Sequence, residues 1–171
     1  IVQGGLYNSL LRGLEQLGLA DLFCTSEIPL YILNVTYPLV PAELEKFAAG
    51  KEALLVVEEG QPAYLEAAIR AALRDSGKPA GVFGKGCFPQ AGEYTREVML
   101  GGLTRFFTDH AAALGRRKIA TGELERIASL RAAAAKGLGP AMPVRPPGFC
   151  TGCPERPVFA AIKLIEEELG P

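Results

Sequence analysis

Two cysteines separated by two residues, Cys150 and Cys153, form the pair in this sequence whose spacing most directly suggests chemistry. Two intervening residues allow both thiolates to turn toward one metal ion or cluster, and in an intracellular protein this spacing favours metal, iron–sulfur or dithiol redox chemistry over a structural disulfide. Cys24 and Cys87 are isolated, so no second pair completes a four-cysteine zinc site. The pair also follows a proline-rich stretch, whereas a thioredoxin-type pair would lie between a strand and a helix. Spacing alone leaves two interpretations open, a ligand pair and two buried thiols.

Adjacent carboxylates follow an apolar run at Glu58 and Glu59. The carboxyl ends of parallel strands are where ligands gather, and two neighbouring carboxylates could perform acid–base catalysis or bind a cationic group. Alternatively, one of them caps the helix that follows, where a negative charge suits the helix dipole, and the other is solvated. We favour this structural role for the pair.

Two further candidates are the segment Gly84-Lys85-Gly86 and the only histidine, His110. The glycine-rich segment follows a predicted strand, but it lacks the spacing of a phosphate-binding loop and the Ser or Thr that follows such a loop. A nucleotide-binding regulator that uses this segment is therefore disfavoured. His110 falls near a predicted helix end, where a cation suits the helix dipole, and we interpret it as structural.

The elements that would position these residues alternate between strand and helix. Short apolar segments predict strands at 1–3, 30–35, 53–57 and 80–83. Apolar residues at helical spacing predict helices at 6–17, 41–50, 62–73 and 93–107. The run at 53–57 is continuously apolar, as expected for a strand covered on both faces. This order indicates right-handed crossovers and an α/β fold, specifically a three-layer sandwich with a mostly parallel sheet.

The composition changes after residue 115. A short helix is predicted over 121–135, and four prolines then crowd residues 140–147, which excludes regular structure there. A helical pattern returns at 154–169. We therefore predict a domain at 1–115, a helical and proline-rich linker at 116–149, and a separate segment at 150–171.

Composition and charge limit the classes of partner. With 18 basic and 19 acidic residues, the net charge of -1 gives no general attraction to phosphate backbones or acidic lipid. No apolar run reaches the roughly 20 residues of a spanning helix, and no leader sequence opens the chain. We expect a soluble, cytoplasmic protein with no nucleic-acid or membrane partner. Because the chain begins without Met and stops directly after a helical pattern, we also expect it to be a piece of a longer protein.

Two motifs resemble one known family. Residues 145–154 (Arg-Pro-Pro-Gly-Phe-Cys-Thr-Gly-Cys-Pro) look like the segment that opens the thiamine-diphosphate domain in the large (alpha) subunit of indolepyruvate:ferredoxin oxidoreductase. Residues 55–62 (Leu-Val-Val-Glu-Glu-Gly-Gln-Pro) are similar to a strand-to-helix turn of the same subunit. The segments at 37–39 and 84–93 fall in the family's order, so the resemblance covers most of the chain.

This resemblance implies a fold and an activity. Residues 1–115 would be a domain like the transketolase C-terminal domain, and residues 150–171 would begin the diphosphate-binding domain. The family oxidatively decarboxylates aryl pyruvates, which are 2-oxoacids, to aryl-acetyl-coenzyme A and passes electrons to ferredoxin. The full-length enzyme would use thiamine diphosphate, magnesium, 4Fe-4S clusters and coenzyme A, and a beta subunit would be its partner. By the same resemblance, Cys150 and Cys153 would be two iron–sulfur ligands, with the others beyond Pro171.

The chain departs from the family in two respects. Glu155 stands where the family usually has His, which replaces an imidazole by a carboxylate with a different charge and no N–H donor. The Gly-Asp motif that binds metal and diphosphate, and the ferredoxin-type cysteines, are absent from these residues. Decarboxylation needs an electron sink that side chains alone do not supply. We therefore expect a non-catalytic structural domain, inactive and free of cofactor when alone.

Two alternatives to this assignment stay open at this point. One is a domain of another thiamine-dependent 2-oxoacid oxidoreductase or decarboxylase that acts on aliphatic substrates. The other is a stand-alone scaffold module in which the pair Cys150 and Cys153 holds zinc.

Overall fold

Short parallel strands at the centre of the chain's first part pair as two ladders. The computed structural model describes residues 1–23, 25–60, 62–75, 77, 81–114, 117–139 and 153–170. The strands are β1 (Val2–Gln3), β2 (Ile32–Leu33), β3 (Ala53–Leu55) and β4 (Gly81–Phe83). β1 pairs in parallel with β2, and β3 pairs in parallel with β4. A parallel bridge between Val2 and Val57 joins the two ladders, so the strands lie in the order β2–β1–β3–β4.

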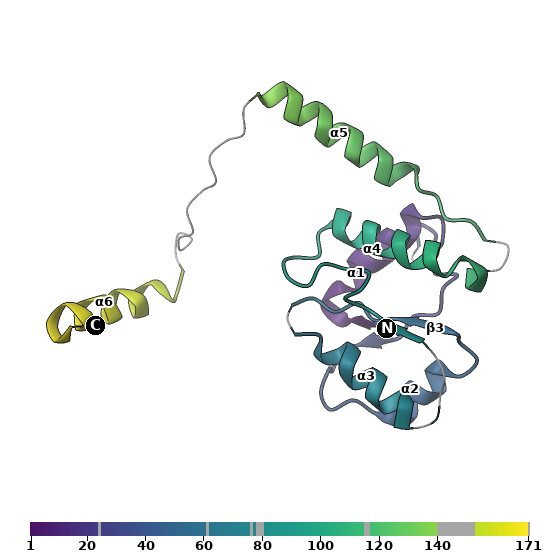
Figure 1. The fold of residues 1–171 in the computed structure, drawn as a ribbon, viewed down its shortest axis with the longest axis horizontal. Coiled ribbons are helices and arrows are strands. Elements are labelled where there is room, and N and C mark those ends of the chain that lie inside the picture. Colours follow the sequence, from purple (N-terminus) through teal and green to yellow (C-terminus); the bar gives the residue numbers. More distant parts are fainter. Residues whose placement is uncertain are drawn as a thin grey trace. The chain divides into compact units, whose positions relative to one another are not determined.

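Helices cover both faces of these strands (Figure 1). The α-helices that lie wholly in the first unit, Ile1–Ala134, are α1 (Tyr7–Gln16), α2 (Pro41–Ala48), α3 (Tyr64–Asp75) and α4 (Arg96–Asp109), and α5 (Gly122–Leu138) begins in it. α1 packs on α4 at one face, and α2 packs on α3 at the other. The predicted α/β class with parallel strands is therefore confirmed.

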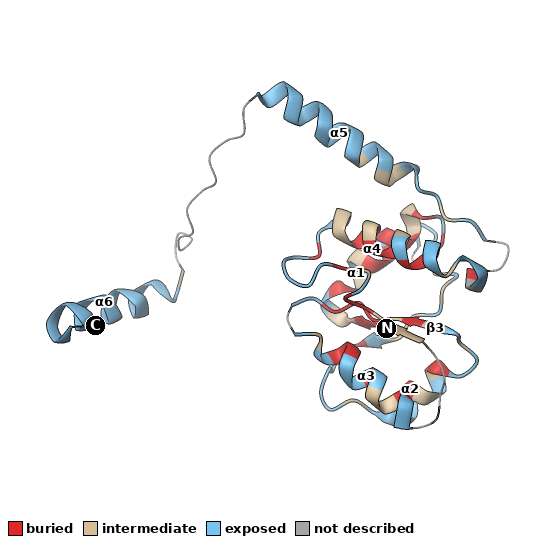
Figure 2. Cartoon of the chain, in the orientation of Figure 1, coloured by how far each residue is buried: buried red, intermediate tan, exposed pale blue. Residues whose placement is uncertain are grey.

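Apolar side chains fill the space between strands and helices, and the buried residues of the helices face the strands (Figure 2). The face covered by α1 and α4 buries Leu14, Met99, Leu100 and Leu103 completely or nearly so, and the face covered by α2 and α3 does the same with Leu44, Ile69 and Leu73. Burial of this apolar surface is the dominant favourable term in folding.

Close contact between α1 and α4 depends on Gly13. A Cβ at this position would lie 2.6 Å from the Cδ1 atom of Leu103, which is shorter than any normal carbon–carbon contact. The absence of a side chain at Gly13 therefore lets the two helices approach until Leu103 fills the space beside it.

Several element boundaries differ from the sequence predictions. The strand predicted at 30–35 is limited to Ile32–Leu33, because its ladder partner β1 is itself two residues long. The helix predicted from residue 93 begins at Arg96, since the Thr95 hydroxyl accepts a hydrogen bond from the Val98 N–H (3.4 Å) and caps the helix there. The helix predicted over 121–135 continues to Leu138.

The chain divides into two units, Ile1–Ala134 and Ala135–Pro171. The boundary lies within α5, whose residues are not buried. The second unit contains α6 (Arg156–Leu169), which confirms the helix predicted at 154–169. The predicted linker prolines at 140–147 lie outside the described residues, and the domain limits at 115 and 149 stay predictions.

Candidate functional site

The carboxyl ends of β3 and β4 hold the two polar segments that the sequence singled out, Glu58-Glu59 and Gly84-Lys85-Gly86. The structure brings them together with two residues that the sequence analysis did not select, Glu66 from α3 and Tyr94 from the segment before α4. We call Glu58, Glu59, Glu66, Lys85 and Tyr94 the polar cluster.

Glu58 caps α3. Its side chain is only 5 % exposed, and its two oxygens accept hydrogen bonds from the Leu65 N–H (2.8 Å) and the Glu66 N–H (3.2 Å). These backbone donors belong to the first turn of the helix and have no partner within it. The predicted structural role of this glutamate is confirmed.

Glu59 is exposed, yet its carboxylate also binds the protein's own backbone. Its Oε1 atom accepts a hydrogen bond from the Tyr94 N–H (2.5 Å), and its own N–H donates to Oε1 of Gln3 (3.0 Å). Glu59 thus ties the ends of β1 and β3 to the segment that leads into α4.

Glu66 fixes the turn after β4. Its Oε2 atom accepts from the Lys85 N–H (2.8 Å), and its Oε1 atom accepts from the Arg70 guanidinium (2.6 Å). A Cβ on Gly84 would lie 2.4 Å from Oε2 of Glu66, so this contact requires glycine. The i,i+4 spacing of Glu66 and Arg70 could have identified Glu66 as half of an ion pair. Nothing in the local sequence indicated that its carboxylate also binds the N–H of Lys85, 19 residues away.

Lys85 is 7 % exposed and its ammonium points to a partner inside the fold. Nζ donates to the Tyr94 hydroxyl (2.9 Å), and that hydroxyl donates to the Pro89 carbonyl (3.1 Å). Burial lowers the pKa of Lys85, while the charges of Glu58, Glu59 and Glu66 oppose that shift. Both the backbone N–H and the ammonium of Lys85 are therefore bound within the chain, which agrees with the absence of a phosphate-loop motif.

A pH dependence follows from Tyr94. Burial, with the carboxylates of Glu58, Glu59 and Glu66, raises the pKa of Tyr94 to about 12, whereas an unfolded tyrosine titrates near 10. Between these values the folded chain keeps a proton that the unfolded chain has lost, so the free energy of unfolding falls as the pH rises. Lys85, with its lowered pKa, acts in the opposite direction, but only up to the pKa of an unfolded lysine near 10.4.

We expect this fall between about pH 11 and pH 12 in urea unfolding, and we expect it to be smaller in the variant Tyr94→Phe. Ultraviolet titration of the native protein would show a late tyrosine ionisation step near pH 12, and that step would be missing from the variant. A Tyr94 that ionises near pH 10 in the folded protein would contradict the prediction.

His110 ends α4, as predicted, and its ring packs on Phe83 and Phe106 with centroid distances of 4.3 and 4.8 Å. These aromatic contacts agree with the structural role that we assigned to it.

The cysteine pair is only half described, because Cys150, like Cys24, lies outside the described residues. Cys153 is a partly buried free thiol just before α6. Cys87 is also free, and burial raises the pKa of its thiol. Within the described part of the chain, no group of three or more His, Cys, Asp or Glu side chains could hold a metal ion.

A crevice of about 500 Å³ lies where the order of the strands reverses, beside the ends of β1 and β2. It is lined by Gln3, Gly4, Asn34, Thr36 and Glu59, with other residues of the same turns. The reversal point of an α/β sheet is the usual place for a ligand. Among the described residues that line this crevice, Glu59 alone carries a charge, and a carboxylate does not suit a phosphate.

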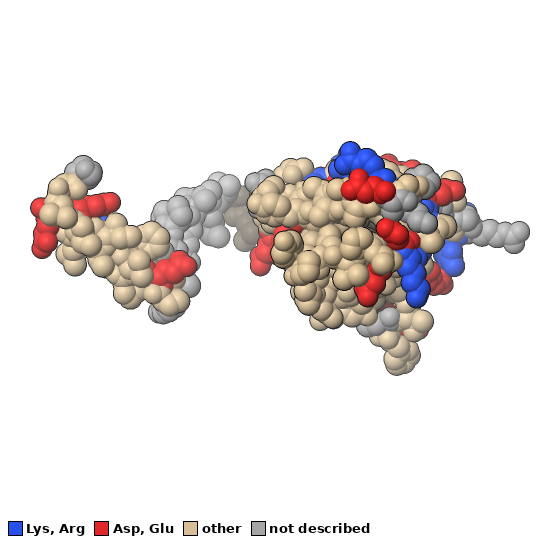
Figure 3. Space-filling view, turned by 90° about the horizontal axis from the view of Figure 1, so that it is seen from below, with Lys and Arg blue, Asp and Glu red and all other residues tan. Residues whose placement is uncertain are grey.

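Charged side chains are mixed on one face of the first unit (Figure 3). On the face in Figure 3, cationic and anionic side chains of the first unit lie beside one another and form no basic stripe. Among the described residues, no helix has the length and apolar character needed to cross a membrane.

Together these features define a parallel α/β domain whose polar cluster, buried except for Glu59, makes its hydrogen bonds within the domain. Comparison with known proteins then gives a specific likeness. The chain resembles indolepyruvate oxidoreductase subunit IorA of Methanothermobacter marburgensis, with 30 % identity over 99 % of this chain. The same subunit of Methanothermobacter thermautotrophicus is 29 % identical over 99 % of the chain, and that of Archaeoglobus fulgidus is 32 % identical over 84 %.

The resemblance predicted from the sequence is thus confirmed. The chain spans 23 % of the length of the two Methanothermobacter proteins and 20 % of the Archaeoglobus protein. No family model and no solved structure matches the chain.

Proposed function

We propose that this chain is a non-catalytic structural domain in the large subunit of an aryl pyruvate:ferredoxin oxidoreductase. The observation that carries this proposal is the likeness to subunit IorA along 99 % of the chain. The polar cluster adds support, because Glu58, Glu59, Glu66 and Lys85 bind groups of their own fold. A catalytic acid or base would instead be expected to face a substrate.

Such a domain would pack against its neighbouring domains and hold them in position. We assign the first unit to the class of the transketolase C-terminal domain, on the basis of its parallel strands and the helices on both of their faces. In the whole enzyme it would support the interface with the pyrimidine-binding domain and with the beta subunit, and it would hold the start of the diphosphate-binding domain in place.

The cofactors belong to the whole enzyme. Thiamine diphosphate with magnesium would supply the electron sink for decarboxylation, coenzyme A would accept the acyl group, and 4Fe-4S clusters would carry electrons to ferredoxin. Among the described residues, no side chains are arranged to hold a metal ion, so we propose that thiamine diphosphate and its magnesium bind in other parts of the protein. We also keep the prediction that the enzyme works in the cytoplasm.

Cys150 and Cys153 are our candidates for two of the iron–sulfur ligands. Their spacing allows both thiolates to reach one cluster. In support of this assignment, Cys153 is a free and partly accessible thiol. The residues that complete the cluster would lie in the rest of the subunit.

The test uses the full-length subunit purified with its beta subunit. We expect reduction of methyl viologen that depends on both indolepyruvate and coenzyme A, and no reduction by the 171-residue chain alone. Cys153→Ser should lower the iron content and abolish viologen reduction, because a cluster needs its thiolate ligands. The matched control is Cys87→Ser. This variant should keep the iron content of the wild-type enzyme, because Cys87 is an isolated thiol beside the apolar core.

Three outcomes would count against the proposal. Faster turnover of pyruvate than of indolepyruvate would favour an oxidoreductase of aliphatic 2-oxoacids. No viologen reduction with any 2-oxoacid would overturn the enzyme class. Stoichiometric zinc on the purified chain, lost when Cys150 and Cys153 are blocked, would favour the scaffold module.

A further inference from the structure

The polar crevice beside the ends of β1 and β2 is a site that the proposed function leaves unused. Its volume of about 500 Å³ lies within the range of roughly 300–1,000 Å³ that is usual for small-molecule sites. Buried Leu6 and Leu33 give it an apolar part. Its polar groups come from four side chains at or just beyond the carboxyl ends of three parallel strands: Gln3, Asn34, Thr36 and Glu59.

The fold uses only some of the hydrogen-bonding groups in this crevice. Oε1 of Glu59 accepts from the Tyr94 N–H, and Oε1 of Gln3 accepts from the Glu59 N–H. Among the described residues, the second carboxylate oxygen of Glu59 and the side chains of Asn34 and Thr36 have no hydrogen-bond partner. A carboxylate only accepts, the Gln3 amide nitrogen only donates, and an amide group or a hydroxyl does both. A ligand that satisfies this set must therefore both donate and accept.

Hydroxyl groups meet this requirement better than an ion does. A phosphate would face the Glu59 carboxylate, and a cation has no lone pairs for the donors of Gln3 and Asn34. A hydroxyl both donates and accepts, and in doubly wound folds a carboxylate in the crevice binds a hydroxyl of a ribose. The mixed set of side chains therefore favours a neutral ligand with neighbouring hydroxyl groups.

Two glycines leave part of the crevice wall without side chains. Gly4 and Gly5 both line it, and neither has a positive φ that would itself favour glycine. A Cβ on Gly4 would lie 2.6 Å from Oδ1 of Asn34, so a side chain there would displace the amide. A Cβ on Gly5 would meet no other part of the described chain within 4 Å, so packing does not account for this glycine. Glycine is also used where the backbone and a ligand approach closely, which would explain it.

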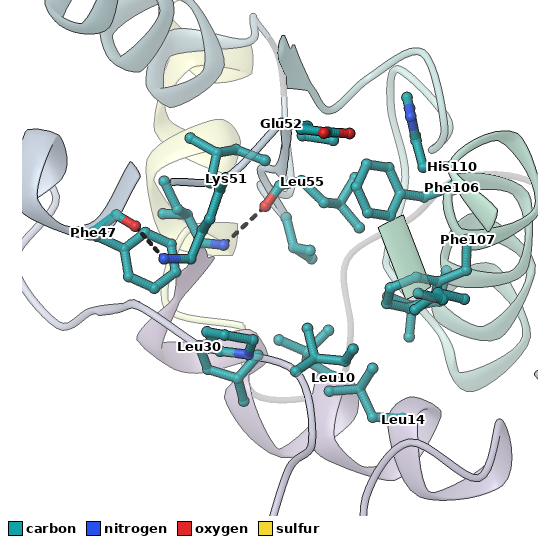
Figure 4. A pocket seen from close by; sticks show the side chains of 18 of the residues that line it. Leu10, Leu14, Leu30, Phe47, Lys51, Glu52, Leu55, Phe106, Phe107 and His110 are labelled. Carbon is teal, nitrogen blue, oxygen red and sulfur yellow. Dashed lines mark hydrogen bonds between the residues drawn. The ribbon is translucent and has the colours of Figure 1, made fainter. Parts of the chain in front are cut away.

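A second hollow, of about 450 Å³, differs in its lining. Most of the side chains around it are apolar, among them Leu10, Leu14 and Phe106 (Figure 4). Hydroxyl groups that left water for such a lining would lose hydrogen bonds. The polar crevice is therefore the better site for a hydroxylated ligand.

We propose that the polar crevice binds a neutral ligand with a vicinal diol, either the ribose of a nucleoside or a free sugar. One hydroxyl donates to the second carboxylate oxygen of Glu59, and the other bonds to the Asn34 amide. Leu6 and Leu33 offer apolar surface to the ring that carries the diol. The site belongs to the domain itself and does not depend on the enzyme class proposed above.

The experiment titrates the full-length protein with 5-fluorouridine and follows the fluorine signal by NMR. We expect saturable binding, and we expect 5-fluoro-2′-deoxyuridine, which lacks one hydroxyl of the diol, to bind at least tenfold more weakly. Methyl β-D-ribofuranoside has the diol without the base and distinguishes the two sources. If it displaces the probe at a similar concentration, the ligand is a sugar, and if it needs at least tenfold more, the ligand is a nucleoside. Either result supports recognition of the diol.

Two variants remove the side chains that would hold the diol. Glu59→Gln keeps an acceptor for the Tyr94 N–H but loses the charge, and Asn34→Ala removes an exposed amide. Each should weaken binding about tenfold. The matched controls are Glu93→Gln, at an exposed glutamate outside the crevice, and Ala112→Trp, in the lining of the apolar hollow. Both controls should bind like the wild type.

Equal affinity for the ribonucleoside and the deoxyribonucleoside would overturn the proposal. So would equal affinity of the wild type and both crevice variants, or no binding at all. Displacement of the probe by coenzyme A would also overturn it, because the probe would then occupy the site of a cofactor proposed for the whole enzyme. Viologen reduction is measured separately, so a failure of the proposed enzyme class is distinguishable from a failure of this site.

Discussion

Replacement of Gly102 by leucine is expected to lower the free energy of unfolding by about 3 kcal/mol, at the upper end of the cost of overpacking a core. Gly102 is buried in the middle of α4, and a Cβ there would lie 2.1 Å from Cε1 of Phe88. The Phe88 ring cannot move aside easily, because it is itself 5 % exposed and stacks on Tyr94 with a centroid distance of 5.0 Å. Relief of the clash would therefore disturb the polar cluster as well.

The neighbouring glycine provides a matched control of opposite sign. Gly101 lies in the same helix, but a Cβ there would meet nothing within 4 Å. Gly101→Ala should stabilise the protein by roughly 0.5–1 kcal/mol, because alanine loses less backbone freedom than glycine on forming a helix. Urea unfolding followed by circular dichroism measures both variants. If Gly102→Leu proved as stable as the wild type, α4 would not pack on Phe88 in the way described.

The fold was largely predictable because apolar spacing reports local geometry. Leu10 and Leu14 repeat at helical spacing and are both buried on α1. The continuous apolar run at 53–57 correctly predicted a strand covered on both faces, with Leu54 and Val56 on one side and Val57 on the other. The length of β2 was not predictable in this way, because it depends on how many residues β1 offers as partners.

The polar cluster was only partly predictable, since its contacts join distant parts of the sequence. A lysine is almost never buried unless it is paired, so nothing local indicated that Lys85 lies inside and donates to Tyr94. The i,i+4 spacing of Glu66 and Arg70 indicates only an ion pair along the helix. The hydrogen bond from the Lys85 N–H to Glu66 forms because the turn after β4 lies over α3, which the local sequence does not indicate. By contrast, the family resemblance came from short motifs, which need no knowledge of the fold.

Glu58→Ala is the second substitution with a large expected effect, a loss of about 2–3 kcal/mol of stability. The variant leaves the Leu65 and Glu66 N–H groups without their buried acceptor, and hydrogen bonds to a charged group are each worth about 1.5–3 kcal/mol. It also removes one of the negative charges that favour the charged form of Lys85. Glu58→Gln keeps one acceptor oxygen and should lose about half as much. Glu93→Ala, at an exposed glutamate, should stay within about 0.5 kcal/mol of the wild type.

The same variants distinguish a structural glutamate from a catalytic one. If Glu58 acts by holding α3, Glu58→Gln in the full-length enzyme should lower the urea midpoint while kcat stays within about twofold of the wild type. A general acid or base would show the reverse, a loss of at least about a hundredfold in kcat with little change in stability. A double-mutant cycle with Lys85→Met adds an independent measurement, because the two charges interact only if they are close in the folded protein. Coupling of more than about 0.5 kcal/mol together with retained turnover would establish that the acidic turn stabilises the domain, and additive effects with lost turnover would place it in a catalytic centre.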